Sequence, residues 1–464
     1  MRFLFIFPPG QRFIIADKKV LPPGPYSPPL GLLYLSKMLE KKGHIVEVLD
    51  YNAENVNVSE FKKKIESADA IGMTVYTNSL DESIDLAHLI KNYNPNIPLL
   101  IGGPHCNIAP EKAIIDLNAD ICATGDVESI ICAIADVLQG KGNLSSIPGI
   151  YYKYKGKIKK TKRMQLIKEL DLLPFPARHL VAKYDYGYFI GEKLINGRTT
   201  SIITTRGCPY HCGFCGYNSV RSRYDERSVE NVIKEIEGII SQGYHSIIIV
   251  DNNFLANKKR AEEIMDRIIE NRLKINMWIM GARVDSAERR LFEKMRDAGV
   301  RFICFGIESG NQDVLNLYNK KTTLKQITKA IRLSKEMGFF TSGNFIIGAT
   351  IETKEHIENT IKFAKSLPLD VAHFLILRYV YGSPLWSKAV DDEIIKQDEY
   401  SVTANSQRNL GLFTEEELKN YCIKAYRNFY FNPRYILRQL LYALKNKNFR
   451  FIKAGLNMFT THEV

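Results

Sequence analysis

The sequence lacks the long apolar run of a membrane-spanning helix. No stretch of its 464 residues approaches the roughly eighteen uncharged apolar residues that such a helix needs. The start, MRFLFIFPPG, reaches proline and glycine too soon for the apolar part of a signal peptide. Apolar residues make up 45% and charged residues 25%, as in ordinary globular proteins and unlike disordered ones. We therefore expect a folded, cytoplasmic protein of two or three domains with no transmembrane segment.

The sequence also lacks the even cysteine spacing of a disulfide framework. Three of its eight cysteines, Cys208, Cys212 and Cys215, stand close together. In a chain without an export signal, such a cluster indicates metal ligation. The other cysteines, such as Cys122 and Cys304, lie mostly in apolar runs, where an ordinary buried thiol is expected.

Positive charge is plentiful and concentrated in two segments. The formal net charge is +13. One segment is residues 152–168, and the other is the C-terminal tail, where basic residues alternate with aromatic ones. The basic residues of the tail are Arg434, Arg438, Lys445, Lys447, Arg450 and Lys453. A solvated basic face is the ordinary interpretation of each segment, and a surface for RNA or anionic membrane lipid is the alternative.

Residues 1–145 alternate short apolar runs with helical patterns. The predicted strands are residues 2–7, 45–50, 70–75, 99–102 and 121–124, and the predicted helices are residues 30–42, 59–67, 80–93, 110–117 and 127–138. This alternation predicts a doubly wound, flavodoxin-like parallel sheet of the α/β class. Ligands of such a sheet bind beyond the carboxyl ends of its strands.

Residues 146–195 interrupt this pattern with a basic hairpin and a proline-rich turn, so we interpret them as a linker. Residues 196–395 then form a second alternating block. Its predicted strands are residues 200–205, 246–250, 277–282, 302–307, 341–347 and 371–377. Six such units predict a partial (βα)6 TIM barrel, with its chemistry at the carboxyl ends of the strands.

Residues 396–464 form a predicted C-terminal helical region. Thr414 and Glu417 have the spacing of a capping box at its start. We expect the helices to cover the barrel mouth or the seam between domains. Their mixture of aromatic and basic residues could admit a lipid or an anionic substrate, or the apolar residues could form an amphipathic core face. Those apolar residues are Ile436, Leu437, Leu440 and Leu441.

The strongest motif is TTRGCPYHCGFCGY, which directly follows the first strand of the second block. Three thiolates on one loop can hold three corners of a 4Fe–4S cluster and leave the fourth iron open. An open iron can bind the amino and carboxyl groups of a small molecule and pass it an electron. A structural zinc site is the alternative, but zinc of that kind takes four protein ligands, and His211 lies between two cysteines on a very short loop.

This motif, with Phe214 before its third cysteine, resembles the radical S-adenosylmethionine (SAM) superfamily. The resemblance implies that a cluster on Cys208, Cys212 and Cys215 cleaves SAM to methionine and a 5′-deoxyadenosyl radical, which takes hydrogen from an unactivated carbon. It also implies an external electron donor such as flavodoxin or ferredoxin.

Further matches extend the resemblance over most of residues 196–390. Asp251, Arg283 and the pair Glu308 and Ser309 follow successive predicted strands. In the family, polar groups at these strand ends hold SAM. The alternative for Asp251 and Arg283 is that they pair with each other or cap helices.

The first block carries two glycine-containing loops. IGGPHCN places Gly102, Gly103 and His105 after the fourth predicted strand, with His105 at the loop tip. ATGDVES places Gly125, Asp126 and Glu128 after the fifth. Together with the segment PPLGLLYLSKMLEKKGHIVEVLDYN, these loops resemble the cobalamin-binding subclass of radical SAM proteins over nearly the whole chain.

The sequence lacks the Asp-x-His-x-x-Gly motif that supplies a lower axial histidine in many cobalamin domains. The resemblance therefore implies base-off, histidine-off cobalamin. Its lower face would be closed by the loop containing Tyr76, Thr77 and Asn78, and His105 would contact the periphery or tail of the corrin.

The resemblance implies a cobalamin-dependent methyltransferase that moves a methyl group from SAM, through methylcobalamin, to an unactivated carbon. A cyclase or rearrangement enzyme with the same cofactors is the first alternative. A tRNA methylthiotransferase would need Cys106, Cys122 and Cys132 to bind a second cluster, and a non-catalytic carrier is a further class. The runs GATIET and YGSPLW depart from the subclass pattern. They leave the substrate open among small molecules, lipids and peptides, and nucleic acid is not expected as a partner.

Overall fold

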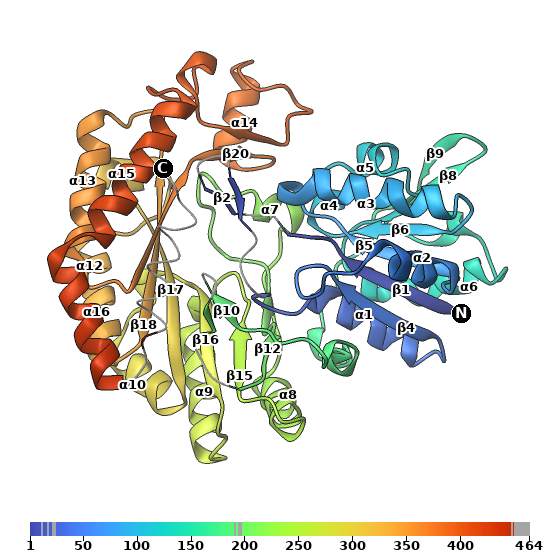
Figure 1. The fold of residues 1–464 in the computed structure, drawn as a ribbon, viewed down its shortest axis with the longest axis horizontal. Coiled ribbons are helices and arrows are strands. Elements are labelled where there is room, and N and C mark those ends of the chain that lie inside the picture. The colour runs from blue at the N-terminus through green and yellow to red at the C-terminus, as the bar shows by residue number, and fades with distance from the viewer. Residues whose placement is uncertain are drawn as a thin grey trace. The chain divides into compact units, whose positions relative to one another are not determined.

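The computed structural model describes residues 1–10, 13–15, 18–20, 25–189, 192–193, 197–446 and 449. The chain divides into two compact units, Met1–Tyr188 and Phe189–Val464 (Figure 1). The division falls inside the segment predicted as a linker, most of which packs with the first unit. The predicted domain limits themselves stay a prediction.

Unit 1 is built on five parallel strands in the order β4-β1-β5-β6-β7. This is the 2-1-3-4-5 order of flavodoxin-like sheets, so the predicted fold class is confirmed. The strands are β1 (Arg2–Phe7), β4 (Ile45–Asp50), β5 (Ala70–Thr74), β6 (Leu99–Gly102) and β7 (Ile121–Ala123), and the helices are α1 (Leu30–Glu40), α2 (Val58–Glu66), α3 (Leu80–Tyr93), α4 (Pro104–Ile108), α5 (Pro110–Asp116) and α6 (Ile131–Leu138).

Alternation along β1 gives unit 1 a core on each face of its sheet. Phe3 and Phe5 pack with the apolar residues of α1 and α6, whereas Leu4 and Ile6 pack with those of α2, α3 and α5. Because successive side chains of a strand point to opposite faces, an uninterrupted apolar strand requires helices on both sides.

The basic hairpin of the predicted linker extends this sheet. Its strands β8 (Ile150–Tyr154) and β9 (Lys157–Lys160) add antiparallel to β7. Lysines on an exposed edge strand discourage pairing with other chains, which gives this basic segment a structural explanation. Two further pairs of short strands lie outside this sheet: β2 (Phe13–Ile15) with β3 (Lys18–Val20), and β10 (Tyr188–Phe189) with β11 (Glu192–Lys193).

Unit 2 contains six parallel strands that neighbour one another in chain order, and β12 and β19 form the two ends of the sheet. The strands are β12 (Thr199–Ile202), β15 (Ser246–Ile249), β16 (Asn276–Ala282), β17 (Val300–Glu308), β18 (Phe340–Ile347) and β19 (Val371–Ile376). The crossover helices are α8 (Val229–Ser241), α9 (Lys258–Glu270), α10 (Arg289–Asp297), α12 (Leu324–Glu336) and α13 (Lys354–Ser366). This is the predicted partial TIM barrel.

The two faces of the barrel sheet differ in chemistry. On β17, Ile303, Phe305 and Ile307 belong to the core shared with the helices. Phe302 points to the other face, where its ring stacks between Trp278 and Phe340. Smaller elements complete the unit: β13 (Thr205–Arg206), α7 (Tyr217–Val220), β14 (Asp225–Glu226), α11 (Gln312–Leu317), β20 (Arg378–Val380), α14 (Pro384–Asp391) and β21 (Ser401–Thr403).

Of the C-terminal helices α15 (Glu415–Tyr430) and α16 (Pro433–Asn446), α15 lies beside α13, and α16 continues from its end (Figure 1). The predicted capping box of Thr414 and Glu417 is present. The helix α15 packs along the edge strand β19. The expectation that these helices cover the barrel mouth or the seam between domains stays a prediction. No helix of the described ranges is both long and apolar enough to cross a membrane.

Tyrosine hydroxyls form hydrogen bonds with backbone groups along the edge strand β19. The Tyr430 hydroxyl accepts from the Ala372 N–H and donates to its carbonyl, both at 3.3 Å. The Tyr426 hydroxyl does the same at Phe374, at 3.2 and 3.4 Å. A parallel strand at the end of a sheet leaves alternate backbone groups unpaired, and here side chains from α15 satisfy them.

Candidate functional site

The three clustered cysteines lie on the loop that joins β13 to α7. The backbone N–H of Gly213 donates to the Tyr318 carbonyl at 2.7 Å, and the Gly213 carbonyl accepts from the N–H of Leu385 at 2.9 Å. The Asn319 amide donates to the His211 carbonyl at 2.8 Å. Two distant segments therefore fix the shape of the cysteine loop.

The thiols of this loop are free and lie near one another. Cys208 and Cys212 are half-buried and Cys215 is exposed. Burial raises the pKa of the Cys208 thiol, the Cys212 thiol adds to that effect, and Arg283 and Lys320 oppose it. Cys215 interacts electrostatically with both of the other thiols. Two cations thus face the cysteine loop, where they would stabilise thiolates.

The thiols are not gathered around a single point. Among the residues that the structure describes, no group of three or more His, Cys, Asp or Glu side chains is arranged to hold one metal ion. A tetrahedral zinc ion would bring thiolates to about 3.8 Å from one another, given its Zn–S distance of about 2.3 Å. A cubane cluster instead places each thiolate on a different iron. The donor set therefore fits a cluster better than a zinc ion.

Arg283, at the end of β16, lies against the cysteine loop. Its guanidinium covers the Tyr210 ring at 3.9 Å from the centroid and points one nitrogen at the Cys212 sulfur at 3.8 Å. It also donates two hydrogen bonds to Asp285, at 3.1 and 3.0 Å. The alternative that Arg283 pairs with Asp251 is therefore wrong.

Glu308, at the end of β17, forms a buried ion pair with Lys320 at 2.5 Å. Glu308 has a φ of +69°, a conformation that is uncommon for a residue other than glycine. The Lys320 ammonium also lies 5.8 Å from the centre of the Phe214 ring, which contacts Tyr318 edge-on. The pair therefore borders the loop that carries the cysteines.

The side chains of Asp251 and Ser309 form hydrogen bonds with other residues of the protein. Both carboxylate oxygens of Asp251 accept from Thr204, one from the backbone N–H at 2.6 Å and one from the hydroxyl at 2.5 Å. Burial raises the pKa of Asp251, and the Thr204 bonds oppose that rise. The Ser309 hydroxyl lies 3.3 Å from that of Thr360. Their predicted contacts with SAM stay predictions.

Three polar side chains on the inner face of the barrel sheet were not among the predicted site residues. The Asn344 amide contacts the Cys304 sulfur at 3.6 Å. His373 pairs in register with Asn344, and burial lowers its pKa to about 4. The Phe189 ring meets both Phe302 and His373 edge-on. The sequence pattern that could have identified these residues is their alternation, at every second position, with apolar residues along β17, β18 and β19.

The glycine loops of unit 1 follow β6 and β7. Gly103 has a φ of +104°, and a Cβ there would lie 2.7 Å from the Thr74 hydroxyl oxygen. The Asn107 amide donates to the Gly103 carbonyl at 3.2 Å, and its oxygen accepts from the Gly125 N–H at 2.6 Å. Asn107 thus links the two predicted cobalamin loops. It is the last residue of the motif IGGPHCN but was not among the predicted site residues.

The structure corrects the placement of His105. It lies in the short helix α4 and is fully buried, whereas the sequence placed it at a loop tip. Its Nδ1 lies 3.1 Å from the Thr77 hydroxyl, in the loop after β5. A helix of five residues beginning at Pro104 was too short to be recognised from periodicity. The His105 ring therefore supports the loop after β5 from inside the unit.

The other predicted residues of unit 1 lie on the loops after β5 and β7. Tyr76 is 40% exposed, and Thr77 and Asn78 belong to the short 3-10 helix that follows it. Asp126 and Glu128 are buried, and the Asp126 carboxylate accepts from the Ile167 N–H at 2.7 Å. The carboxyl edge of the sheet thus brings together the loops that were predicted to bind one cofactor.

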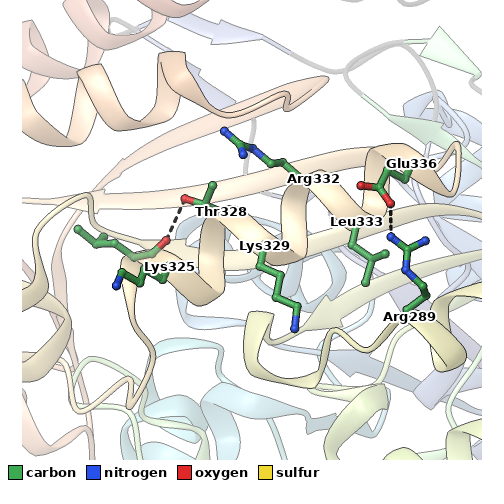
Figure 2. A pocket seen from close by; sticks show the side chains of 8 residues that line it. Arg289, Lys325, Thr328, Lys329, Arg332, Leu333 and Glu336 are labelled. Carbon is green, nitrogen blue, oxygen red and sulfur yellow. Dashed lines mark hydrogen bonds and ion pairs between the residues drawn. The ribbon is translucent and has the colours of Figure 1, made fainter.

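A basic groove of about 680 Å³ lies on the outer surface of unit 2 (Figure 2). Lys325, Lys329 and Arg332 of α12 line it and have no ion-pair partner in the part of the chain that the structure describes. Arg289 of α10 pairs with Glu336 across one end at 2.5 Å. The helix α12 begins four residues after Lys320, whose ammonium lies 5.8 Å from the centre of the Phe214 ring.

Comparisons with known proteins agree with this architecture. The radical SAM superfamily matches residues 202–364, and the B12 binding domain matches residues 20–135. An uncharacterized methyltransferase, PH0819, of Pyrococcus horikoshii is 31% identical over 447 residues, which is 95% of each chain. The anaerobic magnesium-protoporphyrin IX monomethyl ester cyclase of Rubrivivax gelatinosus is 26% identical, over 88% of this chain and 75% of its own.

Two solved structures share the fold. The radical SAM methyltransferase TsrM from Kitasatospora setae, with cobalamin and a [4Fe-4S] cluster bound, matches with a TM-score of 0.67 and 20% identity over 84% of this chain and 75% of its own. The cobalamin-dependent radical SAM enzyme OxsB, with aqua-cobalamin bound, matches with a TM-score of 0.71 and 18% identity over 98% of this chain and 72% of its own. From both family matches and the 31% identity along nearly the whole length of PH0819, it follows that this chain belongs to the cobalamin-binding radical SAM family.

Proposed function

We propose that this protein is a cobalamin-dependent radical SAM methyltransferase that acts on an unactivated carbon. The observation that carries the proposal is the loop of three neighbouring free thiols, faced by Arg283 and Lys320, at the carboxyl ends of a parallel barrel. The relative PH0819, which is 31% identical over 95% of each chain, is named an uncharacterized methyltransferase. When bound, an iron–sulfur cluster would supply the electron that cleaves SAM, and cobalamin would carry the methyl group.

We assign the protein's own groups as follows. Cys208, Cys212 and Cys215 hold the cluster, and Arg283 stabilises the Cys212 thiolate while Asp285 and Tyr210 keep the guanidinium in place. Glu308 and Lys320 offer an anion and a cation for the ammonium and carboxylate groups of SAM. Phe214 shields the cluster from water. Asp251 and Ser309 set the positions of the strand ends.

For unit 1 we propose cobalamin binding in the base-off, histidine-off state. Support comes from the positive φ of Gly103 and Gly125, which allows close approach of the backbone, and from the bridge of Asn107 between their loops. Tyr76, Thr77 and Asn78 close the lower face. His105, whose ring contacts Thr77, positions that loop without contacting the cofactor.

The test is anaerobic purification with cobalamin, followed by reduction in the presence of SAM. We expect 5′-deoxyadenosine from the wild type and none from Cys212→Ala. The matched control is Cys422→Ala on α15, which should retain SAM cleavage. Mass spectrometry of extracts from cells with and without active protein should show a product heavier by one methyl group, formed in step with S-adenosylhomocysteine.

Cyclisation or rearrangement with the same cofactors is the second candidate, because the Rubrivivax relative is a cyclase and aligns with 88% of this chain. That reaction would also yield 5′-deoxyadenosine. A dehydrogenated or mass-neutral product without S-adenosylhomocysteine would favour it and contradict methyl transfer.

We also propose that an acidic electron carrier such as flavodoxin or ferredoxin docks at the basic groove on α12. Lys325, Lys329 and Arg332 present unpaired positive charge, which would steer an acidic protein toward the end of the barrel that carries the cysteines. The substrate is a small molecule, lipid or peptide.

Charge reversal of Lys325 and Lys329 tests this docking surface. The double variant to Glu should lose at least about tenfold in flavodoxin-driven SAM cleavage at low salt and keep dithionite-driven cleavage. Reversal of Lys157 and Lys159 on β9 changes the net charge equally and should leave both rates unchanged. Equal losses with both reductants would contradict the docking proposal.

A further inference from the structure

The helix α16 is held against the barrel by polar contacts on one side. The Tyr435 hydroxyl donates to the Asp370 carbonyl at 2.9 Å, and the Gln439 amide donates to the Asp370 carboxylate at 3.0 Å. The Arg438 guanidinium donates to the Leu369 carbonyl. Because these three residues lie on one face of the helix, they determine which face points away from the barrel.

The face that points away is aliphatic. Its side chains recur at the spacing of a single stripe, i, i+1, i+4, i+5 and i+8. They are Ile436 (42% exposed), Leu437 (59%), Leu440 (42%), Leu441 (59%) and Leu444 (63%). The interpretation of these residues as a core face is therefore wrong, because the protein-facing side of α16 carries Tyr435, Gln439 and Ala443 instead. A contiguous aliphatic stripe of this kind marks an interaction surface.

The charge beside this stripe is entirely positive. Arg434 lies at one border of the stripe, near Leu437 and Leu441, and the sequence contains no Asp or Glu between Glu417 and Glu463. After α16 the sequence adds Lys447, Arg450 and Lys453. A second copy of the chain would bring these charges against one another, and nucleic acid would leave the aliphatic side chains in water. An anionic lipid surface satisfies both features.

We propose that α16 is an interfacial helix that binds the protein to an anionic membrane surface. The stripe enters the boundary between head groups and acyl chains, and Arg434 lies at the level of the phosphates. With 14 residues, the helix is about 21 Å long at 1.5 Å per residue, shorter than the roughly 30 Å hydrocarbon core. It therefore lies along the surface. This inference does not depend on the reaction proposed above.

Co-sedimentation of the full-length protein with vesicles tests the proposal. We expect binding to vesicles of phosphatidylglycerol and phosphatidylcholine, at least tenfold weaker binding to phosphatidylcholine alone, and weakening with added salt. The Leu437→Glu, Leu441→Glu variant should lose at least tenfold in affinity. The matched control is Ile115→Glu, Leu172→Glu, which changes two residues of unit 1 that are 64% and 77% exposed and should bind like the wild type.

Thermal unfolding and dithionite-driven SAM cleavage show whether the α16 variant is folded. A folded variant that binds vesicles like the wild type would overturn the proposal. So would equal binding of the wild type to both vesicle types, or no binding to either. Light scattering measures the oligomeric state. If the wild type is a dimer and the α16 variant is a monomer, the stripe is a self-association surface and the membrane proposal is overturned.

Discussion

Gly103 illustrates how one residue constrains the predicted cobalamin loops. Its φ of +104° is strained for any side chain, and a Cβ would lie 2.7 Å from the Thr74 hydroxyl oxygen. We expect Gly103→Ala to lower the free energy of unfolding by roughly 1–3 kcal/mol and to weaken cobalamin binding. Urea unfolding and absorbance titration measure the two effects. Gly31→Ala on α1, where a Cβ would have open space, is the control and should be neutral or stabilising.

Glu352 should make stability depend on pH. It is fully buried, and burial raises its pKa from 4.5 to about 7 although the Gly348 and Ala349 N–H groups donate to it. A carboxyl group whose pKa is higher in the folded state than in the unfolded state stabilises the fold at pH values below its unfolded-state pKa. This contribution to the free energy of unfolding is lost as the pH rises through about 7.

The free energy of unfolding of Glu352→Gln, measured relative to that of the wild type, should therefore increase by on the order of 3 kcal/mol between pH 4.5 and 7. Above pH 7 this difference should stay constant. Urea unfolding at a series of pH values measures this difference. Glu270→Gln, at an exposed site on α9, should show no such trend. A difference between Glu352→Gln and the wild type that does not vary with pH would contradict the assignment.

At the residue scale, local motifs were predictable and long-range partners were not. The spacing of Cys208, Cys212 and Cys215 was sufficient to predict that three neighbouring thiols share one loop. Lys320 was missed because its partners Glu308 and Phe214 come together only in the folded barrel. Asn107 was missed for the same reason, since it bridges loops after two different strands.

The elements of both units agree closely with their predicted ranges, because each strand is apolar and each crossover helix has a clear apolar stripe. The sequence left open which face of α16 the protein covers. Amphipathic spacing shows that a helix has two faces, and it does not show which one the protein covers. Here tyrosine, glutamine and arginine bind the barrel, and the aliphatic face remains exposed.

The edge strand β19 gives a prediction at the same scale. Tyr430→Phe removes the hydroxyl that pairs with both backbone groups of Ala372, and should cost about 1–2 kcal/mol of stability. Hydrogen exchange at the Ala372 amide should become faster. Tyr421→Phe, on the same helix, is the control for removal of a hydroxyl. Unchanged protection of Ala372 in the Tyr430 variant would refute the role of this hydroxyl.

For the whole molecule, the extent of unit 1 can be tested with fragments. Residues beyond the predicted domain limit of 145 contribute to its core, and the Tyr186 hydroxyl donates to the buried Asp50 at 2.9 Å. We expect fragment 1–188 to unfold cooperatively and to bind hydroxocobalamin, and fragment 1–145 to be markedly less stable. Circular dichroism and absorbance spectra compare the two. Equal stability of both fragments would restore the linker interpretation of residues 146–188.

The anchoring of the cysteine loop also has a consequence for how the enzyme matures. Gly213 is held by Tyr318 and Leu385, which follow it by more than a hundred residues. During synthesis the cysteines leave the ribosome long before either anchor, so the loop acquires its shape only after most of the barrel has formed. A cluster held by this loop, as proposed, would therefore be inserted at a late stage of biogenesis, and variants that slow closure of the barrel should accumulate as cluster-free protein.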